Sequence, residues 1–548
     1  MIETLMPAAP AQALPFEAFH QPLSPLFLDY LAGLPGVTPF FGSEGFDMEG
    51  LLAAARRTAS FPRPREEVAA ALVRQQEARG SERAAAAARE LARPGSVAVV
   101  TGQQAGLFGG PLFVLHKALA TLEIAKRLTE ERGEPAVPVF WVASEDHDFA
   151  EIRTVSVIDG EGGIRSLRYT PGQEPSGQPA WVIALDGDVS RLVRELRAAL
   201  PQGPNRDEVS DLVEECYRPG ESLSGAFARL LSRLLPDLVV LDPADPALKT
   251  LVAPVLSREI EEASPTSRLA LEAGQSLLDA GYHQQVPVRP GFLNLFLLVE
   301  GERRALAIGD DGVEVRGLGR FVAVEDALRQ LATDPSPWSP NALLRPLTQD
   351  AILPTAAYVG GPAEIAYHAQ IGGAYAHFGV PRPALVPRPS VTLVEPAAAR
   401  ALEAEGLELQ DLAGDPEAVL GRWIQKTHPE VEEVFAKAKE AIEREMAGIE
   451  ASLGALDPTL AGAAASARGR ALHQVEGLRE KSTRALKKRD EGRAARLRRA
   501  HDALFPGGSF QERGLGLIGA VARHGTALFA ELRERVDPLA RAHQVVRL

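Results

Sequence analysis

Four ionisable side chains stand in a row directly after one apolar stretch of the sequence. The stretch VPVFWVA, residues 137–143, reads as a buried strand and runs into SEDHD, which holds Glu145, Asp146, His147 and Asp148. Burying unpaired charges costs free energy, so such a row is unusual in the interior of a protein. Carboxylates beside an imidazole can bind an amine, hold a divalent metal or act as a general base. We predict catalytic roles for these four residues; the alternative is an exposed loop that caps the next helix.

A second candidate lies in SVAVVTGQQAGLFGGPLFVLHKA, residues 96–118, where an apolar run leads through glycines into a helix. Glycines let the backbone approach a ligand, and the unpaired amides of a helix N-terminus suit a phosphate or a carboxylate. Because helical side chains lean toward the N-terminus, we predict that His116 reaches back to this loop as a catalytic residue. The spacing matches neither GxGxxG nor GxxxxGK[ST], and a tight connection with a boundary histidine is the alternative. The predicted substrate-binding residues of this segment are Gly102, Gln103, Gln104, Gly106 and Lys117.

A third element, Gly360-Gly361-Pro362, repeats the Gly-Gly-Pro of residues 109–111, again between a predicted strand and a helix. Arg345 precedes it and Arg388 follows it. Arginine recognises carboxylates and phosphates through two parallel hydrogen bonds. We predict substrate binding by Arg345, Gly360, Gly361 and Arg388, with a glycine cap before a proline-started helix as the alternative.

These segments need a sheet that brings them together. Short apolar runs at residues 97–100, 137–143, 238–241 and 292–299 alternate with stretches of helical length, which predicts βαβ units around a parallel sheet. Further strands are expected after Ala351 and over Ala384–Val394. Ligands of open α/β sheets bind at the carboxyl ends of the strands. The sequence therefore predicts one polar cleft, lined by His116 and by residues 145–148.

The pattern changes twice along the chain. Segments near 159–190 and 282–322 are rich in Gly, Pro and short alternating runs, so we predict that they interrupt a Rossmann-like core spanning residues 1–395. Residues 396–505 read as a helical coiled-coil domain in a hairpin broken at Asp457-Pro458, and residues 506–548 as a C-terminal helical segment that packs back on the core. The predicted seam, expected to be buried at least partly between subunits, is Ile442, Met446, Ile449, Leu453, Leu456 and Leu460.

Composition narrows the class of protein. The chain has 548 residues, 45% hydrophobic, with a formal net charge of −14, which argues against a nucleic-acid coat. The single cysteine, Cys216, excludes an internal disulfide and a thiolate-rich zinc site, and the start of the chain lacks the pattern of a secretion signal. We therefore expect a cytoplasmic protein without nucleic-acid or membrane partners. The basic run at residues 479–499 is read as a solvated helix face or as a site for nucleotide phosphates.

Several segments together resemble one family. They are TGQQAGLFGGPLFVLHKA, PVFWVASEDHDFAEI, SPNALLRPLTQD, YVGGPAEIAYHAQ, VPRPSVTLVE and FPGGSFQERGLG, in one order between about residues 100 and 515. They are similar to the cysteine-adding enzyme of bacillithiol biosynthesis, a family of cysteine ligases. Two residues depart from the family's common pattern: Gly109 stands where threonine is frequent, and His368 where tryptophan is frequent.

The resemblance implies a Rossmann-like core with two connecting-peptide insertions and a C-terminal coiled coil that forms a homodimer. It also implies a ligase that forms a carbon–nitrogen (amide) bond between the carboxyl group of L-cysteine and the amine of glucosaminyl malate, the last step of bacillithiol biosynthesis. Because amide formation from a free carboxylate is uphill in water, ATP is the expected activator, leaving ADP, while the need for a metal stays open. Arg345 and Arg388 are then expected to bind the malate carboxylates.

Two other functions remain open from the residues alone. One is a Rossmann-type oxidoreductase, which the missing GxGxxG disfavours. The other is a non-enzymatic coiled-coil assembly protein with a vestigial nucleotide-binding core, which the charged segment SEDHDF disfavours.

Overall fold

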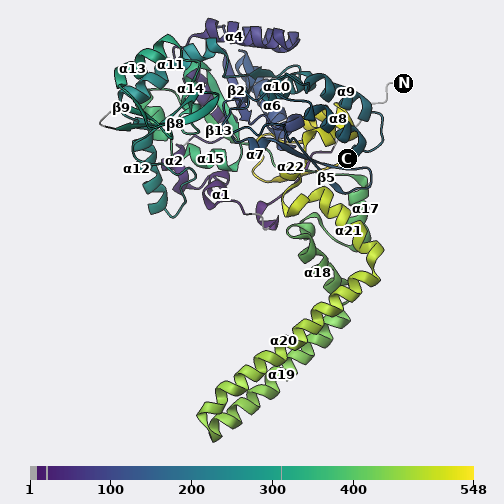
Figure 1. Ribbon diagram of the computed structural model, residues 1–548. Coiled ribbons are helices and arrows are strands. Elements are labelled where there is room, and N and C mark those ends of the chain that lie inside the picture. The colour runs from purple at the N-terminus through teal and green to yellow at the C-terminus, as the bar shows by residue number, and fades with distance from the viewer. Residues whose placement is uncertain (1–8, 20–21, 43, 310–311) are drawn as a thin grey trace. The chain divides into compact units, whose positions relative to one another are not determined.

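The computed structural model describes residues 9–19, 22–42, 44–309 and 312–548 (Figure 1). They form two compact units. The core unit holds the described residues of Met1–Phe16, Pro22–Leu393 and Gln511–Val546, and the helical unit is Val394–Phe510 with short pieces at residues 17–19 and 547–548. The sequence-predicted limits of 1–395, 396–505 and 506–548 stay a prediction.

A parallel sheet lies at the centre of the core unit, in the strand order β13-β12-β2-β3-β6. Its strands are short, valine-rich and buried, as expected where helices cover both faces of a parallel sheet. The Rossmann-like fold class predicted from the sequence is confirmed. The strand bounds are β2 Val97–Gln103, β3 Ala136–Val142, β6 Val239–Leu241, β12 Thr355–Gly360 and β13 Ala384–Pro387.

The strand predicted at residues 292–299 forms, but its assignment to the series of parallel strands is wrong. It is β7 (Phe292–Val299) of an antiparallel sheet with the order β10-β9-β8-β7-β11. The turn Glu300-Gly301, with φ of 52° and 82°, sends the chain straight back into β8, so no crossover helix can follow β7. The other strands are β8 Glu302–Gly309, β9 Gly312–Val315, β10 Arg320–Val322 and β11 Trp338–Pro340.

The single strand expected over Ala384–Val394 is in fact two strands in different sheets. β13 ends at Pro387 and β14 (Val391–Val394) begins a sheet with the order β1-β15-β14. Prolines 387 and 389 lack an N–H donor, so the ladder cannot continue through them, and Arg388 between them donates its N–H to the Gly360 carbonyl (2.8 Å). This break leaves Arg388 at the carboxyl end of the central sheet. The remaining strands are β1 Gln12–Leu14, β4 Thr154–Ile158, β5 Ile164–Arg168 and β15 His543–Arg547.

The helices of the core unit pack around these sheets (Figure 1). The longest is α6, which contacts β2, β3 and β12. The core helices are α1 Pro25–Ala32, α2 Thr38–Phe41, α3 Met48–Ala59, α4 Arg65–Ala78, α5 Glu82–Glu90, α6 Phe113–Arg132, α7 Phe149–Ile152, α8 Asp188–Ala199, α9 Arg206–Cys216, α10 Leu223–Leu234, α11 Pro246–Glu261, α12 Pro265–Asp279, α13 Val324–Thr333, α14 Arg345–Ile352, α15 Pro362–His368, α16 Gly372–Phe378, α22 Gln511–Gly514, α23 Leu517–His524 and α24 Ala527–Arg535.

The long helical segment leaves the core unit after Leu393 and returns to it at Gln511. The side chain of Gln511 accepts a hydrogen bond from Leu393 N (2.8 Å) and donates one to Leu393 O (2.9 Å). We call this pair the clasp. Both of its members are buried, so the two chain ends of the core are fixed to each other independently of the residues between them.

The helical unit is built around an antiparallel hairpin of α19 and α20 (Figure 1). The predicted break at Asp457-Pro458 is confirmed, because Asp457 caps α20 through Thr459 N (2.8 Å) and Pro458 opens the helix. Within one chain the predicted seam is not fully covered: Ile449 is 46% exposed and Leu456 78%. Burial of the seam between subunits stays a prediction. The helices are α17 Pro396–Glu405, α18 Pro416–Thr427, α19 Pro429–Leu456, α20 Pro458–Arg489 and α21 Glu491–Leu504.

Candidate active site

A cavity of about 630 Å³ opens in the core unit where β2, β3 and β12 end. Predicted residues from all three candidate segments line it, which agrees with the rule that ligands bind at the carboxyl ends of parallel strands. Of the predicted site residues, those in the wall are Gly102, Gln103, Gln104, Lys117, Asp146, Arg345, Gly361 and Arg388.

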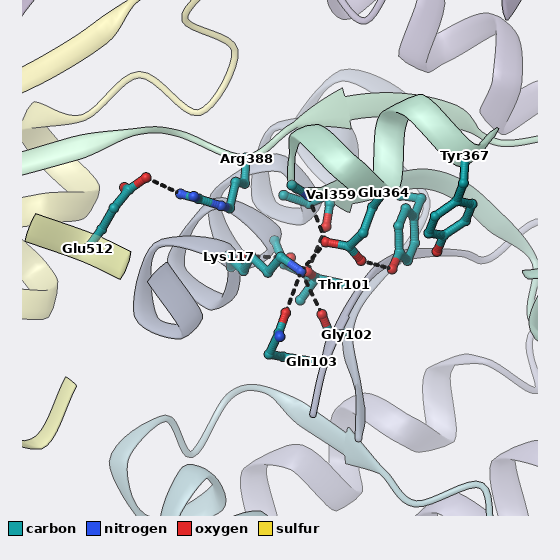
Figure 2. A network of polar contacts seen from close by, with 12 residues as sticks. Thr101, Gly102, Gln103, Lys117, Val359, Glu364, Tyr367, Arg388 and Glu512 are labelled. Atoms are coloured by element: carbon teal, nitrogen blue, oxygen red, sulfur yellow. Dashed lines mark hydrogen bonds and ion pairs between the residues drawn. The ribbon is translucent and has the colours of Figure 1, made fainter. Parts of the chain in front are cut away.

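Lys117 is the centre of a buried polar network in this wall (Figure 2). Its ammonium donates to Gly102 O (2.8 Å), to Gln103 Oε1 (2.9 Å) and to the carboxylate of Glu364. Burial lowers the pKa of Lys117, and Glu364 partly offsets that shift. Burial alone would raise the pKa of Glu364, but Lys117, the Tyr358 hydroxyl and the Gly361 N–H hold it below its usual range. The network therefore holds an ion pair between the buried Lys117 and the partly buried Glu364, with Gly361 fixed by its N–H bond to Glu364 (2.7 Å).

Arginines form a basic wall of the cavity. Arg345 begins α14 and donates to the hydroxyls of Tyr358 (3.3 Å) and Tyr367 (3.2 Å), two neutral acceptors. Arg388 follows β13, and Arg513 reaches the cavity from α22 with its side chain exposed. We call Arg345, Arg388 and Arg513 the basic wall. Guanidinium groups around one cavity suit a ligand that carries carboxylates or phosphates.

The cavity also has an acidic wall, formed by Asp146 and Glu151. Asp146 ends the turn after β3 and accepts a hydrogen bond from Gln104 Nε2 (2.5 Å) and from His147 N (2.7 Å). Burial raises the pKa of Glu151, the Gln104 side chain opposes that rise, the nearby carboxylates of Asp148 and Asp146 add to it, and the charge of Arg513 opposes it. A carboxylate with a raised pKa can accept a proton from an amine, so this wall has the chemistry of an amine site.

The glycine loop after β2 does not form a cradle of free amides. The N–H groups of Gly109, Gly110 and Leu112 donate to Gly106 O (3.2 Å), Leu107 O (3.0 Å) and Leu515 O (2.7 Å), so the expectation of unpaired amides before α6 is wrong there. Gly109 has a φ of 90°, and a Cβ at this position would lie 2.5 Å from Leu517 Cδ2. Gly109 therefore serves a close approach of two chain segments. Gly106 and Gly360 do not line the cavity either.

His116 and Glu145, predicted for the same cleft, are not part of its wall. His116 is buried and its Nδ1 lies 3.0 Å from Glu512 Oε2, while its Nε2 has no partner among the described residues. Glu145 is buried against Lys249, whose ammonium also donates to Trp338 O. Both side chains are held by protein partners, and their catalytic roles stay predictions.

His147 and Asp148 also lie outside the cavity wall. The His147 ring packs on Phe296, with centroids 5.6 Å apart, and its Nδ1 is 3.4 Å from Arg303 Nη1. Burial, and then the charge of Arg303, lowers the pKa of His147. Asp148 caps α7 by accepting from Glu151 N (3.2 Å), which is the helix-cap alternative named for this loop. Only Asp146 of the row faces the cavity, and the single cleft lined by His116 and all four residues is not formed.

Sequence reasoning missed the residues that pair with the predicted cations. Glu364 follows Gly360-Gly361-Pro362 within a segment already quoted for the family resemblance, and Glu512 and Arg513 lie in FPGGSFQERGLG, another of those segments. Their place in segments that resemble the family was the one signal in the sequence that could have identified them as site residues.

Among the described residues, no group of three or more His, Cys, Asp and Glu has the arrangement of a metal site.

No helix in the described ranges has both the length and the apolar composition needed to cross a bilayer. Four of the ten basic residues at 479–499 pair with carboxylates of the helical unit: Arg479, Lys487, Arg493 and Arg498. These contacts favour the reading of a solvated face with ion pairs, and nucleotide binding by the run stays a prediction.

Two family models match nearly the whole chain. Residues 11–389 match "Bacillithiol biosynthesis BshC, N-terminal Rossmann-like domain", and residues 391–548 match "Bacillithiol biosynthesis BshC, C-terminal coiled-coil domain". A protein of Salinibacter ruber is 36% identical over 526 residues, covering 95% of this chain and 96% of the relative. A protein of Solibacter usitatus is 35% identical, covering 95% and 97%. Both carry the name "Putative cysteine ligase BshC". The chain therefore belongs to the BshC family of bacillithiol biosynthesis.

Proposed function

We propose that the chain forms an amide bond between the carboxyl group of L-cysteine and the glucosamine amine of glucosaminyl malate, giving bacillithiol. Family membership supports the pathway, and the name of the relatives supports cysteine as a substrate. The observation that carries the proposal is the cavity with a basic wall and an acidic wall. Glucosaminyl malate bears the two carboxylates of malate and the amine of glucosamine, so it carries charges that complement both walls.

The basic wall would bind the malate carboxylates and leave the amine near Asp146 and Glu151. An ammonium must lose a proton before its nitrogen can attack an acyl carbon. Asp146 would orient the amine, and Glu151, with its raised pKa, would accept the proton. The new bond joins the glucosamine nitrogen to the carboxyl carbon of cysteine, while the bond from that carbon to the activated carboxyl oxygen breaks and this oxygen departs with the phosphate group received from the activator.

Activation of the cysteine carboxyl group is the remaining requirement. Amide formation from a free carboxylate is uphill in water, so we propose ATP as the activator. We also propose a homodimer formed through α19 and α20, since apolar side chains such as Leu456 and Val434 are exposed in the single chain, at 78% and 65%.

The proposal is tested with the purified full-length protein. L-cysteine and glucosaminyl malate are incubated with and without ATP, and the product is measured by mass spectrometry. Asp146→Asn and Arg345→Gln should each lower the rate at least tenfold, because each removes a charge that faces the cavity. Asp237→Asn, which alters an exposed partner of Arg83 outside the wall, is the matched control and should keep the wild-type rate. Absence of bacillithiol with every activator tried would refute the proposal.

A further inference from the structure

A buried carboxylate, Glu512, lies behind the basic wall (Figure 2). Its side chain is 1% exposed. Oε1 accepts from Arg388 Nη1 (2.6 Å) and Ser390 Oγ (3.1 Å), and Oε2 accepts from Val391 N (2.9 Å) and lies 3.0 Å from His116 Nδ1. Four donors surround the two oxygens, so this carboxylate has no lone pair left for a ligand.

Only one nitrogen of the Arg388 guanidinium, Nη1, donates a hydrogen bond to Glu512. Nη1 also donates to Pro389 O (3.2 Å), whereas Nε and Nη2 have no hydrogen-bond acceptor among the described residues. Arg388 lines the cavity although its side chain is only 5% exposed, and its guanidinium lies over the Phe113 ring, 4.9 Å from the centroid. The Nε and Nη2 groups form one planar edge with two parallel N–H bonds, which matches the two oxygens of a carboxylate.

Glu512 fixes this geometry from a part of the chain far from Arg388 in sequence. A guanidinium that lost its buried counter-ion would turn toward other acceptors, because an unpaired buried charge is costly. Burial alone would raise the pKa of Glu512, but Arg388 and His116 hold it well below its usual range, so the counter-ion stays charged at neutral pH. The clasp fixes Gln511, the neighbour of Glu512, to β14. Glu512, which holds Arg388 in place, is therefore itself held in place by the contact of Gln511 with β14.

We propose that Glu512 is a positioning residue, which holds Arg388 so that its Nε and Nη2 edge binds one carboxylate of glucosaminyl malate. This inference rests on the proposed function, which supplies the dicarboxylate ligand. Glu512 itself touches no substrate and acts through Arg388.

The test compares ligand binding in single and double variants of the full-length protein by calorimetry. Glu512→Gln should weaken the binding of glucosaminyl malate at least tenfold and leave the Kd of L-cysteine within about twofold, as expected for one charge-assisted bidentate contact. Arg388→Gln should weaken the binding of glucosaminyl malate by a similar factor. Adding Glu512→Gln to Arg388→Gln should then change the Kd no further, because the positioned group is already absent.

Glu259→Gln is the matched control. Glu259 is also a fully buried carboxylate, but its partners are the neutral groups of Ser264, Thr266 and Asn294, and it does not line the cavity. Its variant should be less stable than the wild type yet bind glucosaminyl malate normally. A purely structural role of Glu512 would instead give additive losses in the double variant and weaker binding of both ligands, which would overturn the inference.

A second variant of Glu512 tests the inference if Glu512→Gln does not fold. Glu512→Asp keeps the charge but shortens the side chain, and should weaken the binding of glucosaminyl malate alone. If neither Glu512 variant folds and Ser390→Ala leaves that Kd unchanged, Glu512 is a stability residue and the inference is wrong. Wild-type protein that does not bind glucosaminyl malate refutes the proposed function, whereas normal wild-type binding with an unchanged Kd in Glu512→Gln refutes only the positioning role.

Discussion

The buried pair of Lys117 and Glu364 makes a quantitative prediction for the substitution Glu364→Gln. The variant leaves the Lys117 ammonium, 1% exposed, with only the neutral acceptors Gly102 O and Gln103 Oε1. Breaking a buried ion pair costs about 3–5 kcal/mol. Since two acceptors remain and the Glu364 side chain is 23% exposed, we expect the lower end, about 3 kcal/mol of unfolding free energy. Urea unfolding followed by tryptophan fluorescence measures the loss.

Two comparisons make this test decisive. Glu130→Gln removes an exposed partner of Lys126 on the same helix α6 and should cost less than about 0.5 kcal/mol. The double variant Lys117→Met with Glu364→Gln removes both charges, so it should be less destabilised than the sum of the single variants. A cost below about 1 kcal/mol for Glu364→Gln, or strict additivity, would refute the reasoning.

The same pair predicts a pH dependence whose sign follows from the pKa of Glu364. In the folded state this pKa lies below the ordinary value of 4.5, so between the two values the unfolded chain binds more protons. The stabilisation by the Glu364 carboxylate is therefore fully present above about pH 4.5 and is lost as the pH falls through the folded pKa. The stability gap between the wild type and Glu364→Gln should narrow over that acidic range.

Three further predictions concern other parts of the chain. His368→Phe should raise the unfolding free energy by about 1 kcal/mol, measured in urea, because both ring nitrogens of His368 are buried without partners among the described residues; a loss of stability would contradict this. Ile449→Asp with Leu453→Asp should give monomers in sedimentation, and an unchanged dimer would place the interface elsewhere. Alanine at residues 487–489 should weaken ATP or ADP binding if the basic run holds phosphates, and equal affinity in calorimetry would leave it a solvated face.

The position of the cavity could be predicted from the sequence because it depends on local signals. Buried valine runs followed by glycines identify β2 and β3, and the rule for parallel strands then places a site at their carboxyl ends. Arg345 and Arg388 were found in the same way, since each lies next to a strand or helix end that glycine or proline marks.

The direction of single side chains could not be predicted in this way. Successive residues of a helix point about 100° apart, so His116 and Lys117 cannot face the same space: Lys117 faces the cavity and His116 faces Glu512. The partners Glu364 and Glu512 lie 247 and 124 residues from Lys117 and Arg388. No periodicity links such distant residues, so only the folded chain shows which charges are paired.

The clasp between Leu393 and Gln511 makes the helical unit an insertion in the topological sense. The core closes on itself at this pair, so the more than one hundred residues between them form one long excursion rather than a link between two halves. Insertions or deletions of whole helical turns there leave the register of the clasp and of the cavity unchanged. Length variation among relatives should therefore concentrate between Val394 and Phe510, while the spacing from Arg388 to Leu393 and from Gln511 to Gly516 stays constant.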